Sequence, residues 1–476
     1  MKKGYKKLLC MALCTIMALT GAGCSSGGDA KKTETEKTAE TTVKSGEQAE
    51  EKTEAKAEET GAAADVSGTI EIWSMMTQQE RVDSFQKIAD DYMASHPGTQ
   101  INITVMPWKG ALDKIVASVM AGNAPDLTIT GIGYPQTLAG TGGLLELSDL
   151  VDELGGEDQF LGTSLSVHGA TEDGGLYSIP LYITPYVAYY RDSWVKEAGY
   201  NKIPETWEDY YDMCKAVTDP SKNRYGFALP LGDQSGWKTI WSFLQANDVD
   251  LVNVDDKGEW YIDIAEDEEK RAAAVEVYDF LYKLTKDCAP EGTISYTQTN
   301  VREMVAGGTV MSRIDTPEIY YNVESIAPDD FDDFKYFKIP GRKTTGSGQG
   351  WVGLSVTSEG NTELAKDFVR FMYSGDEIID FYLSYPYAMF PAKADLFNNK
   401  KYQENLPDVL KEMVPDMALD ILATSSGVVM SNGPFPAAGE IESQNTIGNA
   451  LVKMLTEGYT AEQAVDYLIN EIEKVM

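Results

Sequence analysis

Histidine, cysteine and basic residues are scarce in this 476-residue chain, and each scarcity narrows the possible functions. The chain has two histidines and five cysteines, with no Cys-x-x-Cys pair and no Cys/His cluster, so we expect no metal site. Lysine and arginine total 40 against 75 acidic residues. This balance argues against nucleic acid, because basic side chains that neutralise phosphates supply that affinity. No nucleotide-binding glycine pattern is present, and we expect no cofactor.

Long hydrophobic runs are also scarce, and the one that exists lies at the N-terminus. Leu8 to Leu19 follows four lysines, and it is too short to span a bilayer but long enough for the core of a signal peptide. Small residues then lead to Cys24. This stretch resembles a bacterial lipobox, whose cysteine is diacylated, although Gly21 stands where leucine is usual. We therefore expect a signal peptide at 1–23, with cleavage by the general signal peptidase as the alternative to lipidation.

The segment after this cysteine lacks aromatic residues. Residues 25–66 consist mostly of Lys, Glu, Thr, Ala, Ser and Gly, and such a composition cannot bury enough apolar surface to offset the entropy of folding. We predict that 24–66 is a lipidated cysteine with a disordered tether. The tether would hold a folded domain at the outer face of the bacterial cell membrane, with the lipid as its only membrane attachment.

Only two cysteines remain beyond this segment. Cys214 and Cys288 both lie on apolar faces of helical patterns. These positions favour buried free thiols, and a disulfide stays the alternative.

Strand and helix patterns alternate where the folded region begins. Residues 69–73, 101–105 and 126–130 have strand patterns, and apolar residues recur at helical spacing in 82–92 and 112–120. This order predicts an α/β fold with a parallel sheet covered by helices. Ligands of such sheets bind beyond the carboxyl ends of the strands. The residues expected there are Trp73, Ser74, Trp108, Gly131 and Tyr134.

Five short motifs follow one another along residues 67–476. They are AGNAPDL at 121–127; YSIPL at 177–181 with VAYYRD at 187–192; IPETWED at 203–209; VGLSV at 352–356 with NTELAKDF at 361–368; and GYTAEQAV at 458–465. In this order they resemble the family 1 extracellular solute-binding proteins of ABC importers, which include the maltose-binding type. Each motif alone is weak, but five in register are specific.

The resemblance implies a two-lobed, type II periplasmic-binding-protein fold with a hinge and a cleft between the lobes. It implies a binding protein rather than an enzyme: a monomer that captures a carbohydrate, such as an oligosaccharide or sugar derivative, and delivers it to an ABC permease. The expected lobes are an N-terminal one of 67–181 and 354–392, and a C-terminal one of 182–353 and 393–476.

The resemblance also places candidate contacts at the cleft, where a sugar needs flat aromatic surfaces and hydrogen-bonding groups. We expect Trp237 to stack on the sugar, with packing in the core beside Trp241 as the alternative. Asp315 either accepts hydrogen bonds from sugar hydroxyls or pairs with Arg313. The other candidates are Tyr182, Thr184, Tyr186 and Trp351.

Two other functions stay open. The same fold binds other solutes, such as a peptide or a ferric ion, and adjacent tyrosines suited to iron occur at Tyr320 and Tyr321. A surface enzyme that degrades glycans would need two carboxylates flanking the scissile bond. The 75 acidic residues provide such pairs by chance, but no nucleophile motif accompanies them.

Overall fold

The computed structural model describes residues 67–131, 133–165, 174–341, 349–415 and 426–476, with only the backbone at 349–351. Cys24, the signal peptide and the tether lie outside these residues. Within the described part, no helix combines the length and the apolar character that a membrane span requires.

A six-stranded sheet forms the centre of the first lobe, and the alternating patterns predict its parallel part, β3-β1-β2. Strands β1 and β2 pair in parallel from Gly68 to Ser74, and β3 pairs in parallel with the other side of β1. The order is β12-β4-β11-β3-β1-β2, and the three later strands are antiparallel to their neighbours. The strands are β1 (Gly68–Ser74), β2 (Thr99–Val105), β3 (Leu127–Gly131), β4 (Ile179–Pro185), β11 (Gln349–Val356) and β12 (Phe390–Pro391).

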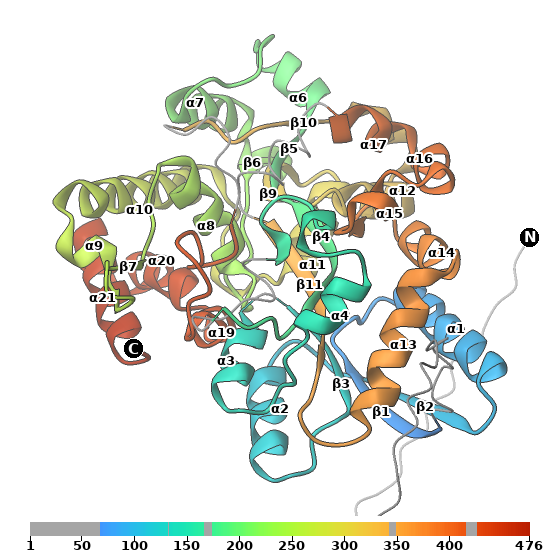
Figure 1. The fold of residues 1–476 in the computed structure, drawn as a ribbon. Coiled ribbons are helices and arrows are strands. Elements are labelled where there is room, and N and C mark those ends of the chain that lie inside the picture. Colours follow the sequence, from blue (N-terminus) through green and yellow to red (C-terminus); the bar gives the residue numbers. More distant parts are fainter. Residues whose placement is uncertain (1–66, 132, 166–173, 342–348, 416–425) are drawn as a thin grey trace, which may run out of the picture. The chain divides into compact units, whose positions relative to one another are not determined.

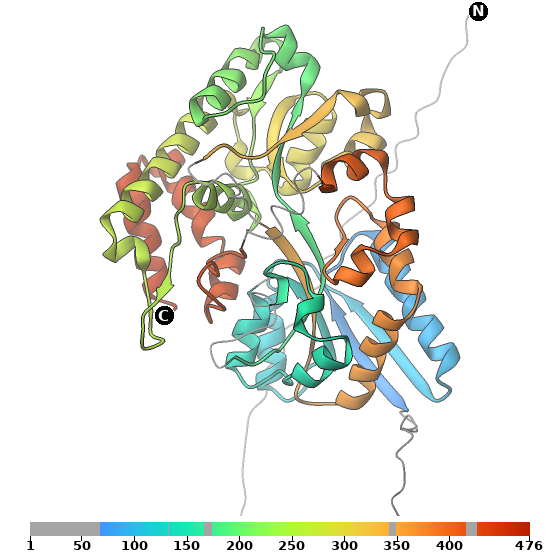
Figure 2. The same cartoon turned by 45° about the horizontal axis from the view of Figure 1, so that its top comes forward.

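Amphipathic helices pack on this sheet. Helix α1 buries Phe85, Ile88 and Tyr92, and its ring contacts with Phe368 and Phe381 join it to α13 and α14. In Figure 2 the blue strands β1 and β2 lie in the lower half beside the orange α13 and α14. The helices are α1 (Gln79–Ser95), α2 (Ala111–Met120), α3 (Tyr134–Gly140), α4 (Ser148–Glu153), α13 (Thr362–Ser374) and α14 (Glu377–Ser384).

A four-stranded sheet forms the centre of the second lobe, with the order β10-β5-β9-β6. Its central pair, β5 and β9, is antiparallel, and β6 adds to β9 in parallel. These strands, with β7 and β8 of a separate hairpin, are β5 (Val187–Arg191), β6 (Tyr225–Phe227), β7 (Asn253–Val254), β8 (Trp260–Tyr261), β9 (Val310–Asp315) and β10 (Phe334–Phe337).

Helices from two distant parts of the sequence complete this lobe. The C-terminal α20 and α21 pack against α10, and α20 also contacts α8 (Figure 1). Thr206 caps α7, and Thr460 forms a capping box with Gln463 at α21. The helices are α6 (Asp192–Glu197), α7 (Trp207–Val217), α8 (Gly236–Ala246), α9 (Asp263–Glu266), α10 (Glu268–Cys288), α11 (Gln298–Ala306), α12 (Ile319–Ile326), α19 (Ala438–Ser443), α20 (Thr446–Glu457) and α21 (Ala461–Glu473).

Between β12 and residue 415, three short helices run along the side of the molecule, where α16 packs against α14. They are α15 (Ala394–Phe397), α16 (Lys400–Asn405) and α17 (Asp408–Met413). The two cysteines of the second lobe, Cys214 and Cys288, are buried free thiols, so the disulfide alternative is set aside.

The chain passes directly from one sheet to the other at Tyr186, which separates β4 from β5. β4 pairs with β11 as far as Pro185, opposite Gln349. The six-stranded sheet therefore extends a few residues past the boundaries expected at 181 and 354. The two-lobed α/β architecture itself is as expected.

Candidate functional site

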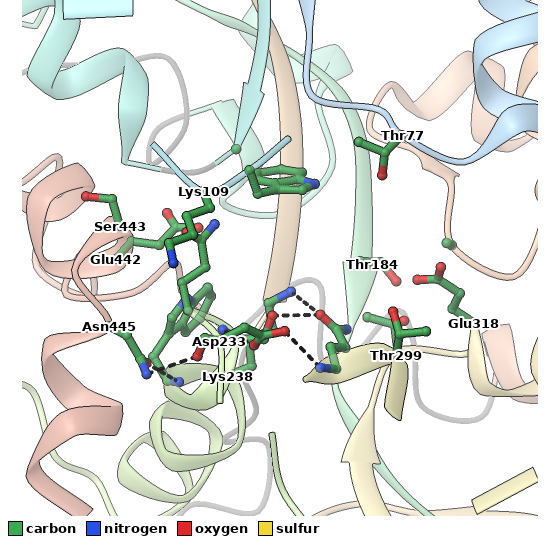
Figure 3. Close-up of a pocket in the computed structure, with 18 of the residues that line it drawn as sticks. Thr77, Lys109, Thr184, Asp233, Lys238, Thr299, Glu318, Glu442, Ser443 and Asn445 are labelled. Carbon is green, nitrogen blue, oxygen red and sulfur yellow. Dashed lines mark hydrogen bonds between the residues drawn. The ribbon is translucent and has the colours of Figure 1, made fainter. Parts of the chain in front are cut away.

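A cavity of about 570 Å³ lies between the two lobes. The first lobe lines it with the start of α1, the loop before α2, the end of β3 and β4, and the second lobe with the loop before α8, α11, the segment after β9 and residues 442–449. Figure 3 shows Glu442, Ser443 and Asn445 on one side, Thr77, Thr184 and Glu318 on the other, and Asp233 and Lys238 between them.

Six of the residues expected at the cleft line this cavity. Trp108 and Gly131 follow strands of the first lobe, and a Cβ added at Gly131 would lie 2.7 Å from Cζ3 of Trp108. Glycine is therefore required for the tryptophan ring to cross the end of β3. The six residues are Trp108, Gly131, Tyr182, Thr184, Tyr186 and Trp237.

Four expected residues, Trp73, Ser74, Tyr134 and Asp315, do not line the cavity, and all but Trp73 are buried elsewhere in the protein. Ser74 is buried at the end of β1 and accepts a hydrogen bond from the amide of Met76. Tyr134 is buried in a small apolar cluster against which Trp73 also packs. The fourth is Asp315, which is paired with arginines. The side chain of Trp351, in β11, lies outside the described residues.

Trp237 combines the two roles that the sequence left open. It lines the cavity, yet only 2% of it is exposed, and its ring meets Tyr186 edge to face at 6.4 Å between centroids. Its amide donates to Asn445 Oδ1 at 3.0 Å. A side chain so deeply buried is part of the core as well as of the cavity wall.

A buried ionic network forms the wall below Glu318. Arg302 donates to both carboxylate oxygens of Asp315, at 2.7 and 2.8 Å, and lies 2.8 Å from Glu318. Arg313 lies 3.0 Å from Asp315. Burial opposes the charge of Asp315, but Arg302 and Arg313 outweigh it and lower the pKa of Asp315 to about 2. Of the two roles expected for Asp315, the structure shows the ion pair with Arg313.

The opposite wall holds a carboxyl group that lacks such compensation. Glu442 is 6% exposed, and its Oε2 is buried with no hydrogen-bond partner in the described structure. Burial raises the pKa of Glu442 to about 8, although Lys238 acts to lower it. Lys238 itself donates to Gln298 Oε1 at 3.1 Å, and no ion pair within 4.0 Å joins it to a described carboxylate.

Residues 87–407 match the family described as bacterial extracellular solute-binding protein. This chain belongs to that family. The match covers most of the folded region and confirms the resemblance given by the five motifs. The family consists of extracellular solute-binding proteins.

Individual proteins agree with this assignment. The diacetylchitobiose-binding protein DasA of Streptomyces coelicolor is 27% identical over 329 residues, which are 66% of this chain and 71% of that protein. A solute-binding protein of Thermotoga lettingae solved with α-D-tagatose has a TM-score of 0.71 at 19% identity, over 86% of this chain and all of that chain. The GacH receptor of Streptomyces glaucescens, solved with acarbose, has a TM-score of 0.70 at 18% identity over 86% and 98%. The two structures share the fold.

The lobes of this solute-binding protein touch at one edge of the cavity through α3 and α19 (Figure 1). Thr137 donates to the carbonyl of Pro436 at 3.0 Å and lies 2.8 Å from Glu440 Oε2. Gly133 and Gly439 approach so closely that a Cβ on Gly439 would lie 2.8 Å from the carbonyl oxygen of Gly133. Two glycines thus permit a contact between backbones.

At the other edge the lobes touch through aromatic and charged side chains. Tyr385 donates to Glu318 at 2.8 Å, and its ring lies 4.4 Å below the guanidinium of Arg81. Tyr321 of α12 donates to Glu80 of α1 and packs against Tyr385. The lobes therefore contact each other at both edges of the cavity, and we refer to this arrangement as the closed state.

Several cavity residues were not expected from the sequence. Thr77 and Arg81 follow β1 in the sequence. They would have been found if the search for residues beyond the carboxyl ends of the strands had extended a few residues further. Lys238 follows Trp237 in the first turn of α8. Arg302 and Glu442 have no local signal, because they lie between the family motifs and reach the cavity through the packing of α11 and α19.

Proposed function

We propose that this protein captures a carbohydrate in the cavity between its lobes and delivers it to the permease of an ABC importer. One observation carries the proposal: the cavity combines aromatic rings with many hydrogen-bonding side chains. Trp108, Tyr182 and Tyr186 provide apolar surface, and polar side chains that include Thr77, Gln78 and Thr299 line the cavity. A sugar has apolar C–H faces and a rim of hydroxyls, which this mixture suits.

The volume supports a small saccharide. Binding pockets for small molecules usually range from about 300 to 1,000 Å³, and this cavity is about 570 Å³. The sugars named for DasA and for the two solved structures support the same solute class. The proposal also includes the boundaries of the two lobes. The chain would cross between the lobes near Tyr186 and at β11, and the lobes would open and close about these crossings.

We further propose that Cys24 carries a lipid that anchors the protein at the outer face of the cell membrane. The basic start, the short apolar run and the small residues before Cys24 support this assignment. A monomer on a tether of residues 25–66 would then reach its permease by diffusion close to the membrane.

The test is a thermal-shift screen of the purified protein against mono- and oligosaccharides that include diacetylchitobiose, D-tagatose and acarbose, followed by calorimetry. At least one sugar should raise the melting temperature and bind with one-to-one stoichiometry. Binding of peptides or ferric ion instead, with no response to any sugar, would refute the carbohydrate proposal. If chromatography showed that a glycan disappears over time in the presence of the protein, the protein would be an enzyme.

A further inference from the structure

Glu442 is the polar group of the cavity whose chemistry the proposed function leaves unexplained. Its carboxyl reaches the cavity from the end of α19 (Figure 3). One oxygen, Oε1, lies near the end of β3, since a Cβ on Gly131 would be 3.7 Å from it. The other, Oε2, has no partner among the described residues. The carboxyl is therefore held by packing, and its buried Oε2 has no hydrogen bond to the described protein.

The covering of Glu442 comes from both lobes. Glu442 belongs to α19 of the second lobe, whereas Gly131 and the ring of Trp108 belong to the first. Separation of the lobes would remove Gly131 and Trp108 and expose the carboxyl to water. Closure would bury it again, and a buried carboxylate without a counter-ion is costly.

The charged and titratable groups around Glu442 do not supply that counter-ion. Lys238 of α8 faces it, but more than 4.0 Å away and already bonded to Gln298. Tyr134 of α3 and Tyr186 also face it, and neither carries a positive charge. Lys109, in the loop before α2, lines the cavity but is an exposed residue. Glu440, on the same helix, is an acid and points to Thr137.

A neutral carboxylic acid resolves this imbalance, because it presents one donor and one acceptor and leaves no unpaired negative charge on Glu442. A sugar hydroxyl likewise has one donor and can accept, so the two match. We propose that Glu442 recognises the solute as a protonated acid, so that the closed cavity takes an uncharged, polyhydroxylated ligand and binds one proton with it. This inference rests on the proposed capture of a carbohydrate and adds the charge of the ligand and the coupled proton.

The sign of the coupling follows from the two states. In the open state the carboxyl should have a pKa near its ordinary value of 4.5, and in the closed state its pKa is about 8. Because closure favours the protonated form, affinity should be constant below pH 4.5 and fall as pH rises toward 8. The fall is at most about tenfold per pH unit for one proton.

The experiment is calorimetry with diacetylchitobiose, or with the sugar of the panel that gives the largest thermal shift if diacetylchitobiose does not bind. Titrations run from pH 5 to pH 9, and in two buffers of different ionisation enthalpy at pH 6.5, to count protons. The wild type should take up close to one proton per sugar. Glu442→Gln, which keeps the shape, should take up none and show a flat pH profile.

Glu457→Gln is the matched control, since Glu457 is exposed at the end of α20, pairs with Lys453 and lies outside the cavity lining, and it should behave as wild type. Identical pH profiles for wild type and Glu442→Gln would overturn the inference while sugar binding stands. So would an affinity that rises with pH, which would mean that Glu442 binds as a carboxylate. If no sugar of the panel binds any variant, the proposed function fails and the inference fails with it.

Discussion

Replacing Gly439 by alanine should weaken solute binding without weakening the free protein. Gly439 lies in α19, where alanine favours the helix over glycine by up to about 1 kcal/mol. In the closed state, however, the new Cβ would lie 2.7 Å from Thr137 Oγ1 and 2.8 Å from the carbonyl oxygen of Gly133. The first atom belongs to a side chain that rotates, but the second belongs to the backbone of the other lobe.

The magnitude follows from the cost of overpacking, which is typically about 1–3 kcal/mol. This cost falls on the closed state alone, so affinity for the sugar should drop by roughly 5- to 150-fold. Calorimetry measures the affinity, and chemical denaturation without ligand measures the stability, which should stay equal or rise.

Gly140→Ala provides the control, because it lies at the end of the facing helix α3 and a Cβ there would meet no atom within 4 Å. It should bind as wild type. If Gly439→Ala also bound as wild type, the contact between α3 and α19 would not belong to the solute-bound state, and the reasoning would be refuted.

Three further predictions concern single residues. Trp237→Ala should lose both sugar affinity and about 3–5 kcal/mol of stability, because the ring is 2% exposed; a melting temperature near that of wild type would contradict its place in the core. Asp315→Asn should cost about 3–5 kcal/mol, because Arg313 would lose its buried carboxylate and Arg302 would keep only Glu318, and it should remove the acid-sensitive stabilisation that Asp315 contributes. Since the pKa of Asp315 is lowered from 3.8 to about 2, its stabilisation is present above pH 4 and lost as pH falls toward 2, which denaturation curves at several pH values measure. Cys24→Ala should release the protein from the membrane fraction, and continued retention with normal processing would count against the anchor.

The sequence predicts the elements better than the contacts. The strand and helix patterns around β1, β2 and β3 predict the parallel half of the first sheet, because periodicity reports which face is buried, but they do not predict the antiparallel β4, β11 and β12. The expectation that ligands bind beyond the carboxyl ends of the strands correctly selects Trp108 and Gly131 as cavity residues, but it also selects Ser74 and Tyr134, which do not line the cavity. Periodicity does not tell whether a side chain at the end of a strand turns outward to the cleft or back into an apolar cluster.

The charged part of the site depends on contacts between distant segments. Nothing in the sequence near Asp315 indicates that Arg302, which lies on α11, pairs with it. Glu442 lies in a stretch without a family motif, and its environment arises only when α19 of one lobe meets β3 of the other. Trp237 shows the limit most clearly, because an aromatic residue in a glycine-rich loop fits both the cavity and the core, and the structure gives it both.

The crystal structure of the protein with the tightest-binding sugar of the panel tests the central claim most directly. We predict the sugar between the lobes, against Trp108 and Tyr186, with a hydroxyl within 3.2 Å of Glu442. A sugar bound outside this cavity, or a cavity left empty in crystals of a stoichiometric complex, would contradict the account.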